Sequence, residues 1–419
     1  MMVTNLFQDI LVINKKIKKF KILFKKFDFP SDLILTINHI IKKNGGKLKI
    51  IGGGSRDLIL NTPTSKDLDL VTDMDAKELV KYLDKEKIKY SKSGLKYGCI
   101  KLIIEKSIIE ITSLRKDFNY DGRRPDIKHT KNWNVDANRR DFTINSIYID
   151  LNGEIFDPHE GYDDLMKKKV KFIGDPKIRI IEDNLRILRF LRFSIKYANI
   201  IDENGFNACK KYKKKIRTLS YERRLEEIKK IIVLNKFRSF FKEISKYFFY
   251  DIFETNVYLK NFEKLVFIEN ILSNVSSMRR LKFFFQKKKR LDFFKAFSGK
   301  DLVRIKYKIS IENYKFQNIK KMIFLHGKIN VIDQVLFDYS NNKISSDYAL
   351  KLNNFVETTK IPKFPINGND IRKLGFKEGL EIGKKLNYLR KIWVDDNFSN
   401  TKKDLIKKIL KSPGNLRRQ

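Results

Sequence analysis

The sequence predicts an α+β protein, with a small α/β head followed by a long helical region. Short β-rich runs are confined to residues 47–150, whereas from residue 178 onward the apolar residues repeat with the 3.6-residue period of an α-helix. The length of 419 residues exceeds what one hydrophobic core usually holds, and the 42% hydrophobic content is typical of a folded chain. We therefore expect several domains.

The head is organised around residues 49–73, KIIGGGSRDLILNTPTSKDLDLVTD. This stretch predicts a strand, a glycine turn at residues 52–54 and a helix that opens at Ser55. A glycine turn that leads into a helix leaves backbone N–H groups to bind phosphate oxygens. Asp67 and Asp69 follow on a predicted strand, where residues i and i+2 face the same side. Two such carboxylates beside a phosphate site indicate metal-dependent phosphoryl or nucleotidyl transfer.

Other elements in and before the head can also be predicted. Residues 1–45 have the apolar spacing of one or two helices. Residues 97–105 and 107–113 form a predicted hairpin, and residues 114–133 are predicted to be a mobile surface loop. Glu110 lies in the middle of an apolar strand, where a buried carboxylate would need a metal or a cation nearby. It is therefore a candidate third acid of the metal site, although it could also be an outward-facing strand residue.

The composition of the chain indicates which kind of partner it binds and in which compartment it is found. The chain has 90 Lys and Arg against 50 Asp and Glu, a net charge of +40, which favours a nucleic-acid partner unless it reflects a general preference for lysine. Cys99 and Cys209 are too few for a disulfide framework or a zinc site, and we expect both to be buried thiols. No apolar run approaches the roughly 20 residues that span a bilayer. With Asp9 early in the chain and no signal-type cleavage site, we expect a cytoplasmic location without an obligate protein partner.

The region after the head reads as helical throughout. Two segments, residues 210–217 and 282–290, mix basic and aromatic residues. They could contact RNA phosphates, or their phenylalanines could be core residues with solvated lysines beside them. We favour a core position for the phenylalanines of 282–290 and RNA contact for some of the cations. A strong helix is predicted at residues 178–197, and further examples are residues 222–233, 237–253 and 281–297.

Several segments resemble motifs of the class II nucleotidyltransferases, the family of tRNA CCA-adding enzymes and bacterial poly(A) polymerases. They are GGGSRDLILNTPTSKDLDLVT, RRDFTINS, GDPKIRIIEDNLRILRFLRF and YERRLEEIKKII, and residues 364–393 are similar to the family's tail. The resemblance implies a nucleotidyltransferase-type head with a mixed sheet, followed by an all-α neck, body and tail. The implied domains are an N-terminal helical extension (1–29), the head (30–150), the neck (151–217), the body (218–275) and the tail (276–419).

The resemblance also implies roles for individual residues. Asp67 and Asp69 would hold Mg²⁺ and act as catalytic residues. Glu110 is added as a further catalytic acid from its place in the strand, not from the resemblance. Arg140 would contact the nucleotide, although the Arg-Arg-Asp triplet that contains it could instead be a structural ion pair. Asn61 stands where the family usually has glycine, a change that asparagine's tolerance of left-handed backbone allows. Nucleotide binding is implied for Gly53, Arg56, Arg140, Asp183, Arg186, Arg189 and Arg192.

Asp183 and Arg186 would act as an amino-acid template for the base. On a predicted helix they are neighbours at i and i+3, and they would otherwise form a weak surface ion pair. An aspartate that only accepts and an arginine that only donates match cytosine and adenine and reject uracil and guanine. This selectivity suits an enzyme that adds C, C and A without a nucleic-acid template.

We therefore predict a tRNA nucleotidyltransferase that uses CTP and ATP, with tRNA bound at its 3′ end and elbow. A poly(A) polymerase is the first alternative, because the same template would serve it. An enzyme that adds only CC or only A is the second, and a non-catalytic RNA-binding protein is the third. The intact Asp67 and Asp69 pair argues against the non-catalytic alternative.

Overall fold

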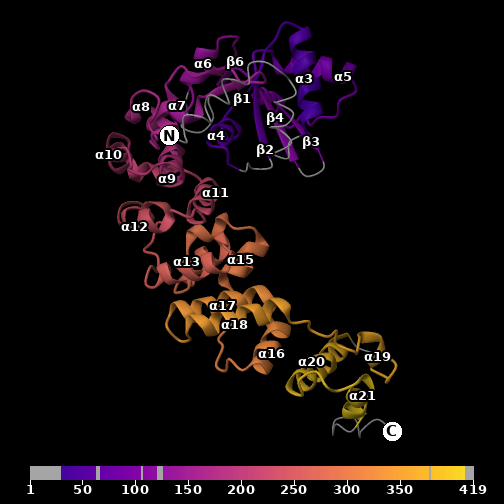
Figure 1. Cartoon of the computed structure of the whole chain (residues 1–419). Helices are drawn as coiled ribbons and strands as arrows, with labels where there is room; N and C mark the ends of the chain where they lie inside the picture. Colours follow the sequence, from indigo (N-terminus) through magenta and orange to yellow (C-terminus); the bar gives the residue numbers. More distant parts are fainter. Residues whose placement is uncertain (1–29, 63–66, 105–106, 120–125, 377–378, 411–419) are drawn as a thin grey trace. The chain divides into compact units, whose positions relative to one another are not determined.

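The chain divides into two compact units, Met1–Asn256 and Val257–Gln419 (Figure 1). The predicted N-terminal extension at residues 1–29 lies outside the described residues. The finer domain boundaries at residues 150, 217 and 275 stay predictions. The computed structural model describes residues 30–62, 67–104, 107–119, 126–376 and 379–410.

The first unit contains a six-stranded sheet in the order β3-β4-β2-β1-β7-β8. Strands β2 and β4 pair in parallel, while all other neighbours in this sheet are antiparallel. The predicted α+β class with a mixed sheet in the head is therefore confirmed. The strands are β1 (Leu48–Ile50), β2 (Asp67–Thr72), β3 (Cys99–Ile104), β4 (Ser107–Ser113), β7 (Tyr148–Asp150) and β8 (Ile155–Phe156).

Strand β2 shows the alternation that places its acids on one face. Leu68 and Leu70 are buried in the core, whereas Asp69 between them is exposed, as the two-residue period of a strand requires. Helix α3 (Ser31–Lys43) packs against β1 and buries isoleucines at helical spacing, among them Ile34 and Ile41. The core of the head thus leaves the face of β2 that carries Asp69 exposed.

The predicted hairpin is confirmed by the antiparallel pairing of β3 and β4. The mobile loop predicted at residues 114–133 is wrong, because β5 (Arg115–Phe118) and β6 (Asp126–His129) pair as a second, two-stranded sheet. Arg115 is held there by the carbonyl of Tyr97, 2.9 Å from its Nη1. Such long-range bonds order a polar segment that carries no apolar period of its own.

The single helix predicted at residues 178–197 is also wrong. The chain forms α8 (Pro176–Glu182) and α9 (Leu185–Tyr197), and Asp183 between them is extended, with φ −149° and ψ 109°. The Asp183 carboxylate accepts the backbone N–H of Leu185 at 3.0 Å. This bond satisfies a donor at the start of α9 and stabilises the break.

The predicted helices at residues 222–233 and 237–253 are confirmed as α11 (Tyr221–Ile232) and α12 (Phe237–Phe253). None of the described helices combines the length and the apolar character needed to cross a membrane. The remaining helices of the first unit are α4 (Gly53–Leu60), α5 (Ala76–Lys85), α6 (Trp133–Asn138), α7 (Gly161–Met166), α10 (Glu203–Tyr212) and the 3₁₀ turns η2 (Leu95–Tyr97), η3 (Thr143–Asn145) and η4 (Lys213–Thr218).

The described part of the second unit is helical. The three phenylalanines at 283–285 are buried, as predicted, but the helix expected at residues 281–297 ends at Phe285. The N–H of Lys288 donates to the Phe285 carbonyl at 2.7 Å, which turns the chain before η5 (Asp292–Ala296). The helices are α13 (Phe262–Ile271), α14 (Ser277–Phe285), α15 (Gly299–Lys306), α16 (Phe316–His326), α17 (Lys328–Ser340), α18 (Ser346–Thr358), α19 (Gly368–Arg372), α20 (Gly379–Asp395) and α21 (Lys402–Leu410).

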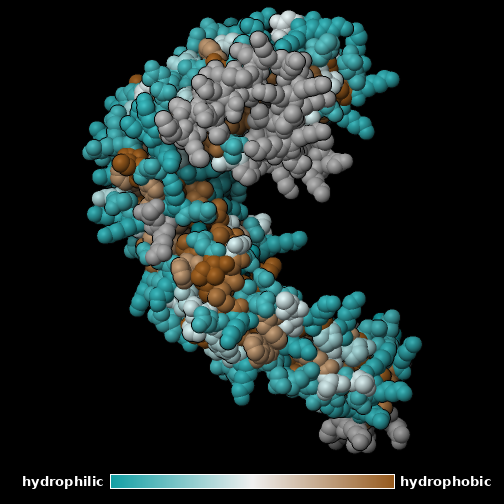
Figure 2. Space-filling model, viewed as in Figure 1, coloured by the Kyte–Doolittle hydropathy of each residue, from teal (hydrophilic) through white to brown (hydrophobic). Residues whose placement is uncertain are grey.

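Buried ion pairs join the helices of the second unit. Glu269 of α13 accepts from Arg279 and Arg280 of α14 at 2.8 and 2.6 Å, and Arg279 also contacts Asp333 of α17 at 2.8 Å. Lys282 belongs to the segment whose cations were expected to contact RNA or solvent, but it is buried against the same Asp333. On the face shown in Figure 2 most side chains are hydrophilic, and an apolar group gathers at α13.

Replacing Gly161 by alanine is predicted to destabilise the first unit. A Cβ at this position would lie 2.0 Å from the carbonyl oxygen of Thr143, which is backbone and cannot rotate away. We expect a loss of about 2 kcal/mol or more in the free energy of unfolding, measured by urea denaturation. Gly53→Ala is the matched control, because a Cβ there meets no atom within 4 Å. Equal stability of the two variants would contradict the close contact.

Candidate active site

The glycine turn places the start of α4 beside the carboxylate of Asp69. Gly52 has φ +67°, a left-handed conformation that glycine adopts without strain, and a Cβ built on it would lie 3.1 Å from Asp69 Oδ2. Helix α4 begins at Gly53, two residues earlier than the Ser55 start that we predicted, and no side chain in the described part of the chain caps it. Its first N–H groups therefore have no capping acceptor, as anion binding requires.

The predicted third acid lies next to Asp69 in the sheet. The parallel register pairs Asp69 of β2 with Glu110 of β4, and Asp67 with Ile108. Glu110 is not buried: its side chain is 37% exposed and forms an ion pair with Lys101 at 3.1 Å, so a lysine already supplies the cation. The side chain of Asp67 lies outside the described part of the chain. Within the described part, no three His, Cys, Asp or Glu side chains are grouped closely enough to hold a metal ion.

A buried thiol also lies beside this site. Cys99 lies at the start of β3, and both cysteines are free and buried, as predicted. Burial and the nearby Glu110 carboxylate raise the pKa of the Cys99 thiol to about 12. The thiol is therefore protonated at neutral pH.

Arg56 joins the first motif to the second and to α9. Its guanidinium donates to the side-chain oxygen of Asn145 and lies 5.0 and 5.1 Å from the ring centroids of Phe193 and Tyr197. Asn145 in turn donates to Asp141 at 2.7 Å. Arg56 is thus held in one orientation by an amide and two aromatic faces.

Arg140 and its neighbour Arg139 are both bound to one buried carboxylate. Arg140 contacts Asp136 at 2.9 Å and Tyr148 at 3.0 Å, and Arg139 contacts Asp136 at 2.7 Å. The ion pairing that we offered as an alternative role for this motif is therefore present. Arg140 also lines a cleft of about 510 Å³, so a nucleotide bound there could still contact it.

The proposed template residues lie near each other but on different elements. Asp183 is in the extended break, not on a helix, and its carboxylate binds Arg223 of α11 at 3.0 Å. Arg186 of α9 contacts Glu182 at 2.5 Å and donates to the Arg139 carbonyl at 3.1 Å. The structure therefore shows no Asp183–Arg186 surface ion pair, and each residue has its own partner.

The two further arginines of α9 are also oriented by acids. Arg189 contacts Asp141 at 2.6 Å, and Arg192 contacts Glu227 of α11 at 2.7 Å. The apolar residues that alternate with the arginines of α9 are buried. These are Ile187, Leu188, Phe190, Leu191 and Phe193.

One cleft of about 510 Å³ collects most of the predicted site residues. Its lining includes Gly53, Arg56, Asp69, Arg140, Asp183, Arg186, Arg189 and Arg192. An adjoining cleft of about 470 Å³ shares Gly52, Asp69 and Arg140 with it and adds Glu110, Lys101 and Tyr97. Asp69 therefore stands where two clefts meet.

Several lining residues were not predicted. Arg115 and Asp117, 3.0 Å apart, lie in the segment that reads as a loop, so no local pattern marks them. Arg139 could have been found, because it is the first arginine of the RRD triplet. Asp141 and Asn145 belong to the same motif and line the cleft as well.

Comparisons with known proteins place this geometry in a family. Residues 48–171 match the family described as "Poly A polymerase head domain". The chain is 30% identical to "CCA tRNA nucleotidyltransferase 1, mitochondrial" of Homo sapiens, over 90% of this chain and 89% of that protein. It is 29% identical to the "CCA-adding enzyme" of Staphylococcus saprophyticus, over 80% of this chain and 84% of that protein.

Solved structures share the fold. A Bacillus stearothermophilus CCA-adding enzyme in complex with CTP superposes with a TM-score of 0.63 at 20% identity, covering 92% of this chain and 98% of that one. A Thermotoga maritima CCA-adding enzyme complexed with tRNA_CCA gives a TM-score of 0.53 at 17% identity, covering 93% and 97%. With the sequence identity over nearly the whole length, these findings show that the chain belongs to the family of CCA tRNA nucleotidyltransferases.

Proposed function

We propose that this protein adds the 3′-terminal CCA to tRNA from CTP and ATP. The observation that carries the proposal is one cleft that is lined by the start of α4, by exposed Asp69, and by both Asp183 and Arg186. The first two suit a metal-bound triphosphate, and the third suits a cytosine or adenine edge. The relatives named as CCA-adding enzymes support the same reaction.

Membership of this family implies dependence on a divalent metal, and we propose that the metal is Mg²⁺. Asp67 and Asp69 would hold it, with Glu110 as a further ligand once Lys101 is displaced. Carboxylate oxygens are the donors that this hard cation prefers, and exposed Asp69 beside the Gly52 turn fits such a site. When bound, the metal would lower the pKa of the RNA 3′-hydroxyl and neutralise charge on the phosphates.

The triphosphate would lie against the start of α4. The backbone N–H groups after Gly52 would face its oxygens, and Arg56 and Arg140 would supply charged donors. Arg189 and Arg192 would add positive charge along the same cleft. Each of these arginines is held by an acid or an amide, so little ordering is left to occur on binding.

The base would be read by Asp183 and Arg186. Asp183 would accept from the exocyclic amino group of cytosine or adenine, and Arg186 would donate to the adjacent ring nitrogen. Glu182 and the Arg139 carbonyl hold Arg186 in the cleft. Because both bases present the same pattern, one pair of residues would serve CTP and ATP in turn.

The RNA 3′ end would occupy the adjoining cleft, on the other side of Asp69. The 3′-hydroxyl would then attack the α-phosphate and release pyrophosphate. Basic residues of the helical region, including some of 210–217, would contact the tRNA backbone. The cytoplasmic location remains our prediction, because some curated relatives are named as mitochondrial proteins.

A poly(A) polymerase is the second candidate, favoured by the description of the matched head family. Enzymes limited to CC or to A share the same template and follow as further alternatives. A non-catalytic RNA-binding protein would not need the Gly52–Asp69 arrangement.

The reaction itself can be tested with tRNA transcripts that end before CCA, after CC, or complete. We expect C, C and A to be added to the first, A to the second and nothing to the third, when CTP, ATP and Mg²⁺ are supplied. Product sequencing gives the result. Long A tails on unrelated RNA would show a poly(A) polymerase, and absence of any incorporation would support the non-catalytic alternative.

Asp69→Asn is predicted to abolish incorporation. Loss of a metal-holding carboxylate removes several kcal/mol of transition-state stabilisation, so we expect the rate to fall by about 1,000-fold or more. Gel-shift measurements should find tRNA binding unchanged. The control is Asp84→Asn, which removes an exposed carboxylate of α5 outside both clefts. If Asp69→Asn incorporates nucleotides at the rate of the control, Asp69 does not hold the metal.

Arg186→Ala is predicted to relax base choice. A lost pair of donors to a base edge costs about 1–3 kcal/mol of discrimination, so we expect the ratio of kcat/KM for CTP over UTP to fall about 10- to 100-fold. Arg217→Ala is the control, because this arginine pairs with Asp251 and lines neither cleft. An unchanged ratio in Arg186→Ala would contradict the template role.

A further inference from the structure

A single buried carboxylate, Asp136 of α6, is the common partner of several groups at the cleft. Its side chain is 0% exposed. It accepts from Arg139 at 2.7 Å, from Arg140 at 2.9 Å and from the Tyr148 hydroxyl at 2.7 Å. The backbone N–H of Arg115 on β5 donates to it at 3.3 Å. Four groups from the second motif, β5 and β7 therefore converge on one acid.

The carboxylate is ionised in this environment. Burial alone would raise its pKa, but Arg140 and Arg139, with the Tyr148 hydroxyl, lower the pKa well below its usual range. An ionised acid inside a protein is tolerated only when paired and hydrogen-bonded, as Asp136 is. The interaction is therefore charge-assisted and strongly oriented.

Asp136 binds one edge of the Arg140 guanidinium and leaves the other edge available. Nε and Nη2 of Arg140 donate to Asp136, and Nε also donates to the Tyr148 hydroxyl at 3.0 Å. Over the ranges that the structure describes, no hydrogen bond involves Nη1 of Arg140. Because Arg140 lines both clefts, its remaining N–H groups can serve a ligand there.

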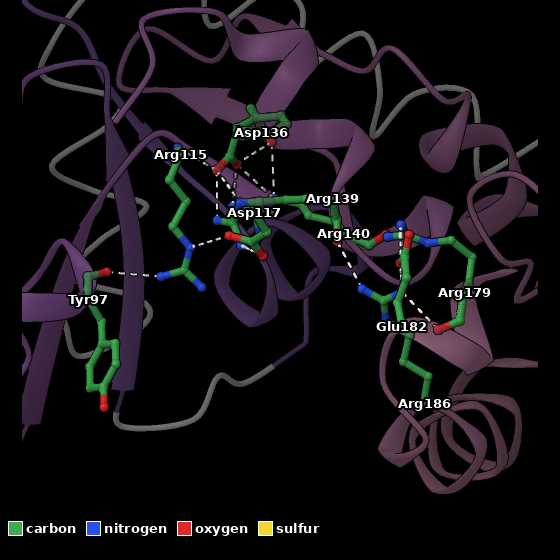
Figure 3. Close-up of polar contacts among 10 residues, drawn as sticks. Tyr97, Arg115, Asp117, Asp136, Arg139, Arg140, Arg179, Glu182 and Arg186 are labelled. Carbon is green, nitrogen blue, oxygen red and sulfur yellow. Dashed lines mark hydrogen bonds and ion pairs between the residues drawn. The ribbon is translucent and has the colours of Figure 1, made fainter. Parts of the chain in front are cut away.

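The same acid connects the cleft to the base-reading residues. The carbonyl of Arg140 accepts from Arg179, and the carbonyl of Arg139 accepts from Arg186, as Figure 3 shows. Glu182 then bridges Arg179 and Arg186 at 2.6 and 2.5 Å. A shift of Arg139 and Arg140 would therefore move the carbonyl groups that bind Arg186 directly and, through Arg179 and Glu182, indirectly.

We propose that Asp136 is a positioning residue for nucleotide binding, acting through Arg140. The inference rests on the proposed function. Asp136 fixes the inner edge of the guanidinium so that the outer edge faces the nucleotide before it arrives. Tyr148 shares this task, since its hydroxyl bridges the acid and the arginine. Neither residue would touch the substrate.

The test is a double-mutant cycle on CTP affinity, measured by calorimetry on the full chain with Mg²⁺ and without RNA. We expect Asp136→Asn to raise the Kd about tenfold in the wild-type background and less than about twofold in an Arg140→Ala background. A purely structural role would give the same factor in both backgrounds. Asp164→Asn is the matched control, because it removes a buried acid that pairs with Lys171 outside both clefts.

Tyr148→Phe makes the same test without leaving an unpaired buried charge, so it applies even if Asp136→Asn folds poorly. We expect its increase in Kd, about threefold, to vanish in the Arg140→Ala background as well. The inference would be overturned if the substitutions had equal effects on the Kd in both backgrounds, or if neither single variant changed the Kd. If the wild-type protein still adds CCA, the proposed function stays intact. A wild type that binds no CTP would overturn both.

Discussion

The site depends on the close approach between the backbone of Gly52 and the carboxylate of Asp69. Glycine is favoured at this turn by its positive φ, and a Cβ built there would lie 3.1 Å from Asp69 Oδ2. The contact brings an uncapped helix start close to a carboxylate, although the helix start favours an anion and the carboxylate favours a cation. A triphosphate and a metal satisfy both together, because the phosphates suit the helix and the cation suits the acid.

A second constraint is the excess of arginines over acids around that point. Arg56, Arg140, Arg189 and Arg192 line one cleft, and shared carboxylates or an amide hold them apart. Asp136 and Asp141 are buried, so their charges are committed to the arginines and not to solvent. The cleft therefore stays electropositive while its donors are already oriented, which is the form of preorganisation that phosphoryl transfer uses.

The parts of this site that are encoded locally could be predicted from the sequence. The glycine turn, the alternating acids of β2 and the buried face of α9 follow from spacing alone. The left-handed Asn61 at the end of α4, with φ 50°, was also expected. The break at Asp183 was missed, because the helical period continues across it and only a side-chain bond to Leu185 marks it. Arg115 and Asp117 were missed because their strand is ordered by partners far away in the sequence.

The most direct measurement is a crystal structure grown with CTP and Mn²⁺, whose anomalous signal locates the metal independently of the protein. The account predicts a peak that contacts the Asp69 carboxylate, with the triphosphate against the first turn of α4 and the cytosine edge facing Asp183 and Arg186. A metal and triphosphate bound away from the contact between Gly52 and Asp69 would contradict it.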